Sequence, residues 1–183
     1  MPNWCMTSYV VEGSKHAINR IYDALENHDV QENSSSSWIG NVLIKLGIKF
    51  EGARVRAFYR GGAEIYDGKL KFVLEEAWCR QDFAELIERK FPSTTVYWIA
   101  EEGGCQIYET NDSKGKYFPE RYWVDVCVNG EYDSQYFEVE EDAFKWVSEL
   151  AGVDLKTQKD VERWNINAED VGDFVYIYKF EVL

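Results

Sequence analysis

Apolar positions between residues 70 and 110 predict a strand, a helix and two more strands. From Leu70 to Glu76, large apolar residues stand at every second position, as in a strand with one more deeply buried face. The following stretch has the three- and four-residue spacing of an amphipathic helix, at Phe83, Leu86, Ile87 and Phe91. We place Asp82 in its first turn, and Pro92 ends it. Thr94 to Ala100 and Cys105 to Thr110 are then strands joined at Gly103-Gly104.

The residues before this stretch complete a ferredoxin-like order. Trp4 to Val11 predicts a strand, and Ser14 is a suitable cap for the amphipathic helix that follows. Ser37 is expected to cap an inserted helix that ends at Gly47. Arg54 to Arg60 is strand-like or irregular, and Ala63 to Tyr66 forms a hairpin with Leu70 to Glu76. The helix between residues 81 and 92 should make its flanking strands parallel neighbours or near neighbours, and both main helices should pack on one face of the sheet.

The remaining third predicts a β-β-α-β extension. Asn129-Gly130 is a strong hairpin turn between Tyr122 to Val128 and Tyr132 to Val139. A helix follows near residues 143–150, then a weaker helix capped by Thr157, and Phe174 to Val182 closes the chain as a strand. The expected fold class is therefore α+β, a ferredoxin-like β-α-β-β-α-β sandwich with an inserted helix. We expect a single domain over residues 1–183, with a core at 1–112 and an acidic extension at 113–183 packed on it.

Charge divides the chain unevenly. The whole chain carries a net charge of −13, and residues 117–183 hold 16 acidic and 6 basic side chains, a net of −10. Residues 45–71 instead hold seven basic and three acidic side chains, an excess of four positive charges. The molecule is therefore expected to be bipolar.

Cysteine spacing predicts the state of the thiols, and hydropathy predicts the location of the protein. Cys5, Cys79, Cys105 and Cys127 are widely spread, without the close pairs of a zinc site, and we expect four reduced thiols and no metal. The repeated dipeptides Trp4-Cys5 and Trp78-Cys79 are interpreted as large and small apolar residues that fill one end of the core. A thiol or metal site is the alternative if the two dipeptides come together. No apolar run is long enough to span a bilayer, and no signal segment is evident, so a cytoplasmic location without membrane contact is expected.

The opening Met1-Pro2-Asn3-Trp4-Cys5 carries a family resemblance, together with three later motifs. These are Ala77-Trp78-Cys79 before the central helix, Phe91-Pro92 after it, and Glu101-Glu102-Gly103. In this order they resemble the YubB ferredoxin-like family, whose members are encoded on plasmids, phages and other mobile elements. The resemblance covers about residues 1–112 and implies a fold, while it implies no activity. The run from Trp38 to Phe50 departs from the pattern of shorter relatives.

Motifs for catalysis are absent from the sequence. It has no phosphate-binding loop, serine elbow, zinc-binding helix or dinucleotide fingerprint. His16 and His28 are expected to be solvated or capping. The pairs Glu75-Glu76 and Glu101-Glu102 are expected at solvated strand ends, because neighbouring residues of a strand point to opposite faces. We therefore expect no enzyme, no catalytic residue and no cofactor.

Two binding functions remain. The first is an accessory protein that binds an unknown protein partner, with homo-oligomers possible, through an acidic and aromatic surface. The second, less favoured, is single-stranded nucleic-acid binding through the basic segment and sheet aromatics. The candidate binding residues are Arg54, Arg56, Arg60, Lys69, Lys71, Trp98, Tyr108 and Trp123. Other aromatics expected on strands are Tyr97, Tyr122, Tyr132, Tyr136, Phe137, Tyr176 and Tyr178. We expect the basic segment to dock on the acidic C-terminal region, within one chain or between two.

Overall fold

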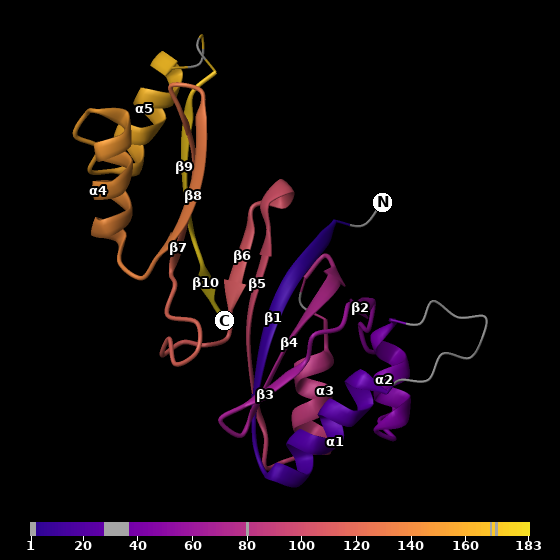
Figure 1. The fold of residues 1–183 in the computed structure, drawn as a ribbon. Helices are drawn as coiled ribbons and strands as arrows, with labels where there is room; N and C mark the ends of the chain where they lie inside the picture. Colours follow the sequence, from indigo (N-terminus) through magenta and orange to yellow (C-terminus); the bar gives the residue numbers. More distant parts are fainter. Residues whose placement is uncertain (1–2, 28–36, 80, 169, 171) are drawn as a thin grey trace. The chain divides into compact units, whose positions relative to one another are not determined.

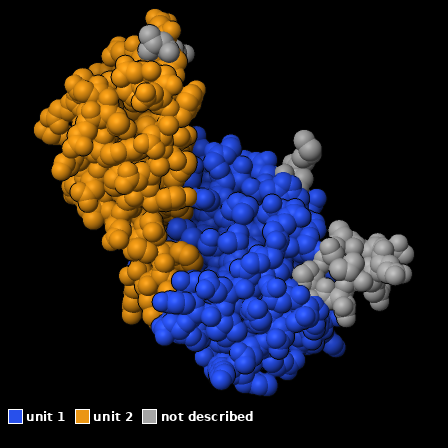
Figure 2. All heavy atoms as spheres, viewed as in Figure 1, with its two compact units in different colours: residues 1–113, 183 blue, residues 114–182 orange. Residues whose placement is uncertain are grey.

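The protein divides into two compact units. The computed structural model describes residues 3–27, 37–79, 81–168, 170 and 172–183. Unit 1 contains residues 1–113 with Leu183, and unit 2 contains residues 114–182 (Figure 2). Both units combine helices with a sheet, which confirms the α+β class. The boundary lies next to the expected start of the acidic extension, whose packing on the core stays a prediction.

Unit 1 is built on an antiparallel sheet in the order β6-β5-β1-β4-β2, with β3 also paired to β4 (Figure 1). Its strands are β1 (Trp4–Glu12), β2 (Ala57–Tyr59), β3 (Glu64–Tyr66), β4 (Lys69–Ala77), β5 (Thr95–Glu102) and β6 (Ile107–Thr110). A 3₁₀ turn, η1 (Gly103–Cys105), links β5 to β6. Because β1 is antiparallel to both β4 and β5, those two strands run in the same direction as near neighbours, as predicted.

Three helices of unit 1 pack on one face of this sheet: α1 (Lys15–Glu26), α2 (Ile39–Lys45) and α3 (Phe83–Lys90) (Figure 1). Their apolar stripes follow the spacing of an amphipathic helix. One hydrophobic cluster joins Ile18, Leu25, Leu43, Leu86 and Ile87 of the helices to Tyr9, Val11, Leu70, Phe72, Leu74 and Val96 of the strands. The predicted packing of the first and last of these helices on the same face is confirmed.

The N-cap of α1 can be tested by substitution. The Oγ atom of Ser14 accepts a hydrogen bond from the Ala17 N–H at 3.3 Å, as the sequence predicted. Replacing Ser14 with alanine leaves that N–H without its partner, and we expect the free energy of unfolding to fall by about 1 kcal/mol. Urea denaturation measures the loss. Ser14→Asp keeps an acceptor and should retain most of the stability, so equal losses in the two variants would contradict a capping role.

Two helix starts differ from the sequence prediction. The N-cap of α2 is Trp38 and not Ser37, because Trp38 is held in extended backbone by a bridge to Phe58. Its indole N–H also donates to the Val55 carbonyl at 2.8 Å. Asp82 occupies the N-cap position of α3 and not its first turn, and its side chain makes no capping hydrogen bond. Both helices therefore begin where a neighbouring segment binds the residue before them.

Unit 2 is a three-stranded antiparallel sheet with two helices (Figure 1). The sheet order is β8-β7-β9, with β7 (Tyr122–Val128), β8 (Glu131–Phe137) and β9 (Phe174–Lys179). The Asn129-Gly130 turn has positive φ at both residues, 55° and 77°, as expected for this hairpin. A further short strand, β10 (Glu181–Val182), follows β9 in the chain.

The β-β-α-β order expected for the extension becomes β-β-α-α-β, because the weaker helix expected from Thr157 onward is fully formed. Unit 2 contains α4 (Glu140–Ala151) and a full second helix, α5 (Gln158–Ala168). The hydroxyl of Thr157 donates to the Asp160 carboxylate at 2.7 Å and accepts from the Asp160 N–H at 3.3 Å, so Thr157 starts α5 as predicted. Val161 is buried in the unit 2 core, and this burial stabilises a helix whose apolar stripe is weak in the sequence.

Candidate functional site

One face of the unit 2 sheet is lined with aromatic side chains. Directly opposed residues of paired strands share a face of the sheet, so the register sorts the side chains. Trp123 of β7 lies opposite Tyr136 of β8 and Tyr178 of β9, and Cys127 lies opposite Tyr132 and Phe174. We call this surface the aromatic face; its rings are those of Trp123, Tyr132, Tyr136, Phe174, Tyr176 and Tyr178.

The other face of the same sheet is covered by α4 and α5. Its apolar residues form one core with Ala143 and Val147 of α4 and Val161 of α5. The strand residues in this core are Tyr122, Val124, Val126 and Val175, with Phe137 and Ile177 packed against it. Alternation in the three strands therefore sends the aliphatic residues to the helices and most of the aromatic residues to the opposite side.

Neighbouring rings of the aromatic face contact each other. The ring centroids of Trp123 and Tyr136 are 5.7 Å apart, and those of Tyr132 and Phe174 are 6.0 Å apart. Along β9, Phe174 stacks on Tyr176 at 5.1 Å, and Tyr176 lies 6.0 Å from Tyr178. Tyr132 is 76% exposed, Tyr136 45% and Tyr176 43%, so a large part of this ring surface is accessible. Exposed aromatic clusters of this kind mark interaction surfaces.

A carboxylate lies among these rings. Asp125 of β7 is opposite Ser134 of β8 and Tyr176 of β9, so it stands in the middle row of the aromatic face. Partial burial raises the pKa of this carboxyl group, because its charged form loses hydration. The three strands place no lysine or arginine on this face. The surface is therefore electron-rich and acidic, which suits a cationic ligand.

Cys127 lies under the edge of the same face. The rings of Tyr132 and Phe174 meet from the two flanking strands at the level of Cys127. The Cys127 thiol is buried, although Cys127 belongs to the aromatic face and not to the face that α4 and α5 cover. Cys127 therefore contributes to packing beneath the rings.

Of the three sequence-predicted aromatic candidates, only Trp123 lies on the aromatic face. Trp98 of β5 packs against the unit 1 core, on the same side of the sheet as the helices. Tyr108 of β6 is buried, with 7% of its surface exposed. Trp98 is therefore only partly accessible and Tyr108 is hardly accessible, and a binding role for either residue stays a prediction. Sorting strand positions 123–127, 132–136 and 174–178 by alternation is the signal that identifies the complete aromatic face.

The five basic candidates all lie in unit 1, and three of them form ion pairs there. Arg54 binds Asp82 through two donors at 2.9 and 3.0 Å, and its backbone N–H donates to the same carboxylate at 2.9 Å. Arg60 pairs with Glu75, and Lys69 pairs with Asp67 at 2.6 Å. These three positive charges are therefore paired with carboxylates of unit 1. The proposed docking of the segment on the acidic C-terminal region stays a prediction.

Arg56 and Lys71 instead lie over aromatic rings. The guanidinium of Arg56 is 5.3 Å from the Trp78 ring centre and 5.9 Å from that of Trp4, and Lys71 is 5.5 Å from the Tyr66 ring. An open pocket of about 540 Å³ lies beside Arg56, between Trp38 and Trp78. Arg54, Val55 and Gln81 complete its main walls. Arg56, Trp4 and Trp78 therefore form a cation–π cluster at the end of β4, whereas the Lys71–Tyr66 contact lies near the start of that strand.

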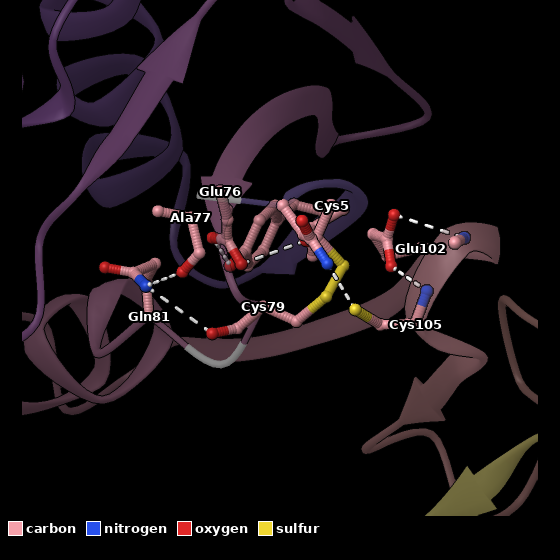
Figure 3. Close-up of a disulfide and its surroundings, with 11 residues drawn as sticks. Cys5, Glu76, Ala77, Cys79, Gln81, Glu102 and Cys105 are labelled. Atoms are coloured by element: carbon pink, nitrogen blue, oxygen red, sulfur yellow. Dashed lines mark hydrogen bonds between the residues drawn. A yellow bond between two sulfur atoms is a disulfide. The ribbon is translucent and has the colours of Figure 1, made fainter. Parts of the chain in front are cut away.

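The expectation of four reduced thiols is wrong. Cys5 and Cys79 form a disulfide with a Cα separation of 5.2 Å, while Cys105 and Cys127 are free (Figure 3). The register explains the contact, because Cys5 lies opposite Glu76 at the end of β4. Trp78 and Cys79 then take positive φ angles of 58° and 51°, which turns the chain back toward β1. The Trp-Cys dipeptides do meet, and they do so as a covalent link.

Glu76 corrects a second expectation. Its side chain is 1% exposed and lies on the helix-covered side of β4, whereas Glu75 on the other side is half-buried. The Glu76 carboxyl group accepts hydrogen bonds from Tyr9 at 2.5 Å and Thr7 at 2.9 Å. Burial raises its pKa to about 7, and the hydrogen bonds from Tyr9 and Thr7 oppose that rise. Glu76 is thus a core residue and not a solvated one.

The histidines and the charged clusters offer no further site in the described part of the chain. His16 is exposed on α1, as expected, while His28 lies outside the described residues. Among the residues that the structure describes, no group of three or more His, Cys, Asp or Glu is arranged to hold a metal ion. No helix in the same set is long and apolar enough to cross a bilayer.

A scan of the chain against models of protein families finds no match, and a search of the curated proteins finds none either. The functional argument therefore depends on the geometry of the two units.

Proposed function

We propose that this chain is a non-enzymatic accessory protein that binds another protein through the aromatic face of unit 2. The observation that carries the proposal is the sheet face opposite α4 and α5, where the described residues of the three strands contribute six aromatic side chains and Asp125 but no lysine or arginine. Aromatic side chains contribute large contact areas at protein interfaces and lose little conformational entropy there. The partner segment that fits this surface presents arginine or lysine side chains, because cations bind both to ring faces and to a carboxylate.

The charge of this part of the chain favours the same class of partner. Residues 117–183 carry a net charge of −10, which attracts a basic protein segment over roughly the Debye length, about 8 Å at physiological salt. The same charge repels the phosphates of a nucleic acid. Long-range attraction by the acidic side chains and short-range contact with the rings therefore act on one kind of partner.

Peptide binding tests the proposal. A fluorescently labelled arginine-rich peptide should bind the full-length protein, and its citrulline counterpart, which has the same shape without the charge, should bind much more weakly. Replacing Trp123 with alanine should weaken binding of the arginine peptide about tenfold, as expected for the loss of a cation–π contact at a partly desolvated site. Fluorescence anisotropy at physiological salt measures both dissociation constants.

A charge-matched pair of variants separates the site from general acidity. Asp125→Asn and Asp133→Asn each remove one negative charge from the same sheet, but Asp133 lies opposite Val126 and thus outside the aromatic face. We expect Asp125→Asn to weaken binding and Asp133→Asn to have little effect. Equal losses in the two variants, together with unchanged binding by Trp123→Ala, would show that net charge alone attracts the peptide and would reject the proposal.

Single-stranded nucleic-acid binding through residues 45–71 is the alternative. The cation–π cluster around Arg56 favours it, since exposed rings and arginines can stack on bases. Phosphates would have to displace Asp82, Glu75 and Asp67 from Arg54, Arg60 and Lys69, which reduces the gain in affinity. A labelled oligonucleotide that binds at micromolar concentration and is released by Arg54→Glu with Arg56→Glu would favour this alternative.

For unit 1 we propose the ferredoxin-like arrangement of the YubB-like family. Support comes from the strand order β5-β1-β4-β2 with antiparallel neighbours and from α1 and α3 on one face. On this proposal α2 is an insertion before β2, and unit 2 is the acidic extension. The members of that family are encoded on mobile elements, so on this proposal the accessory function belongs to a mobile element.

A further inference from the structure

Three cysteines from three separate segments gather at one end of the unit 1 sheet (Figure 3). Cys5 near the start of β1 and Cys79 after β4 form the disulfide, and both are almost completely buried. Cys105, in the turn between β5 and β6, has a free and exposed thiol. Figure 3 shows the Cys105 sulfur directed toward the disulfide. A thiol beside a disulfide is the arrangement that thiol–disulfide exchange requires.

Strand register and hydrogen bonds account for this proximity. Met6 of β1 lies opposite Glu101 of β5, so continuing the register by one residue brings Cys5 opposite Glu102. The Glu102 carboxylate accepts hydrogen bonds from the backbone N–H groups of Gly104 and Cys105, which holds the turn at the end of β5. The Cys105 thiol is therefore held in the turn that directly follows Glu102, the residue opposite Cys5.

Asn3 connects the thiol with the segment that carries Cys79. Its side-chain amide donates to the Cys105 sulfur, and its backbone carbonyl accepts from the Trp78 N–H at 2.9 Å. Asn3 is also two residues before Cys5 in the chain. Asn3 thus contacts both the Cys105 thiol and the turn that carries Cys79, and it lies close to Cys5 in the chain.

The turn at Cys79 is held in an unfavourable conformation. Trp78 and Cys79 are consecutive non-glycine residues with φ of 58° and 51°, a left-handed backbone that side chains disfavour. The Gln81 amide donates to the Ala77 carbonyl at 2.7 Å and to the Cys79 carbonyl at 3.4 Å, while it accepts from the Arg56 N–H at 2.7 Å. The disulfide and Gln81 together keep this turn closed, so release of Cys79 allows the backbone to relax.

We propose that Cys105, Cys5 and Cys79 form a thiol–disulfide exchange centre. The Cys105 thiolate attacks the sulfur of Cys5, a new bond forms between Cys105 and Cys5, and the bond to Cys79 breaks with its electron pair on the Cys79 sulfur. The proton that Cys105 gives to water is balanced by the proton that the Cys79 thiolate takes up. One disulfide replaces another, so the step needs no external oxidant or reductant.

Exchange changes the surface next to the cation–π cluster. Trp78 stands directly before Cys79, lies under the Arg56 guanidinium and lines the 540 Å³ pocket. In the exchanged form, the Trp78 turn is no longer tied to β1 by a covalent bond. The exchange centre is in unit 1 and does not depend on the peptide binding proposed for unit 2.

Non-reducing peptide mapping tests the exchange. Protein purified without reductant is incubated at pH 8, quenched with acid, alkylated with N-ethylmaleimide and digested with trypsin. Cleavage after Lys and Arg separates the cysteines into peptides 1–15, 72–80 and 91–114, so each link has its own mass. We expect two linked species, Cys5 with Cys79 and Cys5 with Cys105, and alkylated Cys79 accompanies the second species.

Two variants make the result decisive. In Cys105→Ser, alkylation of Cys79 should be lost and only the Cys5–Cys79 link should remain. In Cys79→Ser, oxidised glutathione should produce the Cys5–Cys105 link. Absence of that link in both the wild type and Cys79→Ser would overturn the proposal. Links that include Cys127, which is buried in unit 2, would indicate random scrambling and would also count against it.

Discussion

Replacing Phe83 with alanine is expected to lower the free energy of unfolding of unit 1 by about 3–5 kcal/mol. Phe83 begins α3 and is completely buried. Its ring meets those of Tyr9 and Phe72 edge to face, with centroids 5.6 and 5.8 Å away, and those two rings stack on each other at 5.1 Å. The substitution removes the ring that joins α3 to β1 and β4, and a cavity remains because two strands fix the neighbouring rings.

Urea denaturation, with amide exchange of β1 and β4 to assign the loss to unit 1, measures this effect. Tyr66→Ala provides the control, since Tyr66 is also aromatic and lies in the same sheet but is 62% exposed. Its removal should cost less than about 1 kcal/mol. Similar losses in the two variants would show that the three-ring cluster does not stabilise the unit.

The helices and strands that were predicted correctly are those with regular periodicity. The alternation in β1 and β4 and the helical stripe of α3 indicated elements that tertiary packing then retained. The start of α2 was missed because a long-range contact decided it: Trp38 is held by Phe58 and Val55, and local capping rules at Ser37 contain no such information. The sequence predicted α5 only as a weak helix for a related reason. Its apolar positions are poorly spaced, and burial of Val161 in the unit 2 core stabilises the helix nevertheless.

The candidate sites depended on register, which periodicity alone does not determine. Trp123 was selected from the sequence, but its ring neighbours became evident only when β8 and β9 were aligned with β7. The disulfide was missed because Cys5 and Cys79 are 74 residues apart, and their contact needs a left-handed turn at Trp78 that propensities disfavour. The basic segment was expected to dock on the acidic C-terminal region, and its pairing partners within unit 1 were not foreseen, because only folding brings Asp82 and Glu75 to two of its arginines.

Glu76 connects the ring cluster of unit 1 to pH. It lies on the core side of β4, and its carboxyl group accepts the hydrogen bond of Tyr9, whose ring contacts Phe83. Burial is the main cause that raises the pKa of Glu76 from 4.5 to about 7. Burial, followed by the charge of Glu76, raises the pKa of Tyr9 as well. Near neutral pH the fold therefore favours a protonated Glu76 that the unfolded chain would ionise.

The sign of the pH effect follows from this difference. The folded state holds the Glu76 proton more tightly than the unfolded state does, so its contribution to stability is complete below pH 4.5 and is lost as pH rises through 7. A shift of this size corresponds to about 3 kcal/mol. Glu76→Gln keeps a carbonyl acceptor for Tyr9 and cannot ionise, so the variant should lack this loss.

We therefore expect the stability difference between the wild type and Glu76→Gln to move by about 3 kcal/mol in favour of the variant between pH 4.5 and pH 8. Urea denaturation of both proteins at half-unit pH intervals measures it, and groups common to both cancel in the difference. Glu64→Gln on the exposed strand β3 should give a difference that stays nearly constant over the same range. A constant difference for Glu76→Gln would mean that the pKa of Glu76 is the same in the folded and unfolded states, and the buried Tyr9 hydroxyl would then donate to a carboxylate at neutral pH.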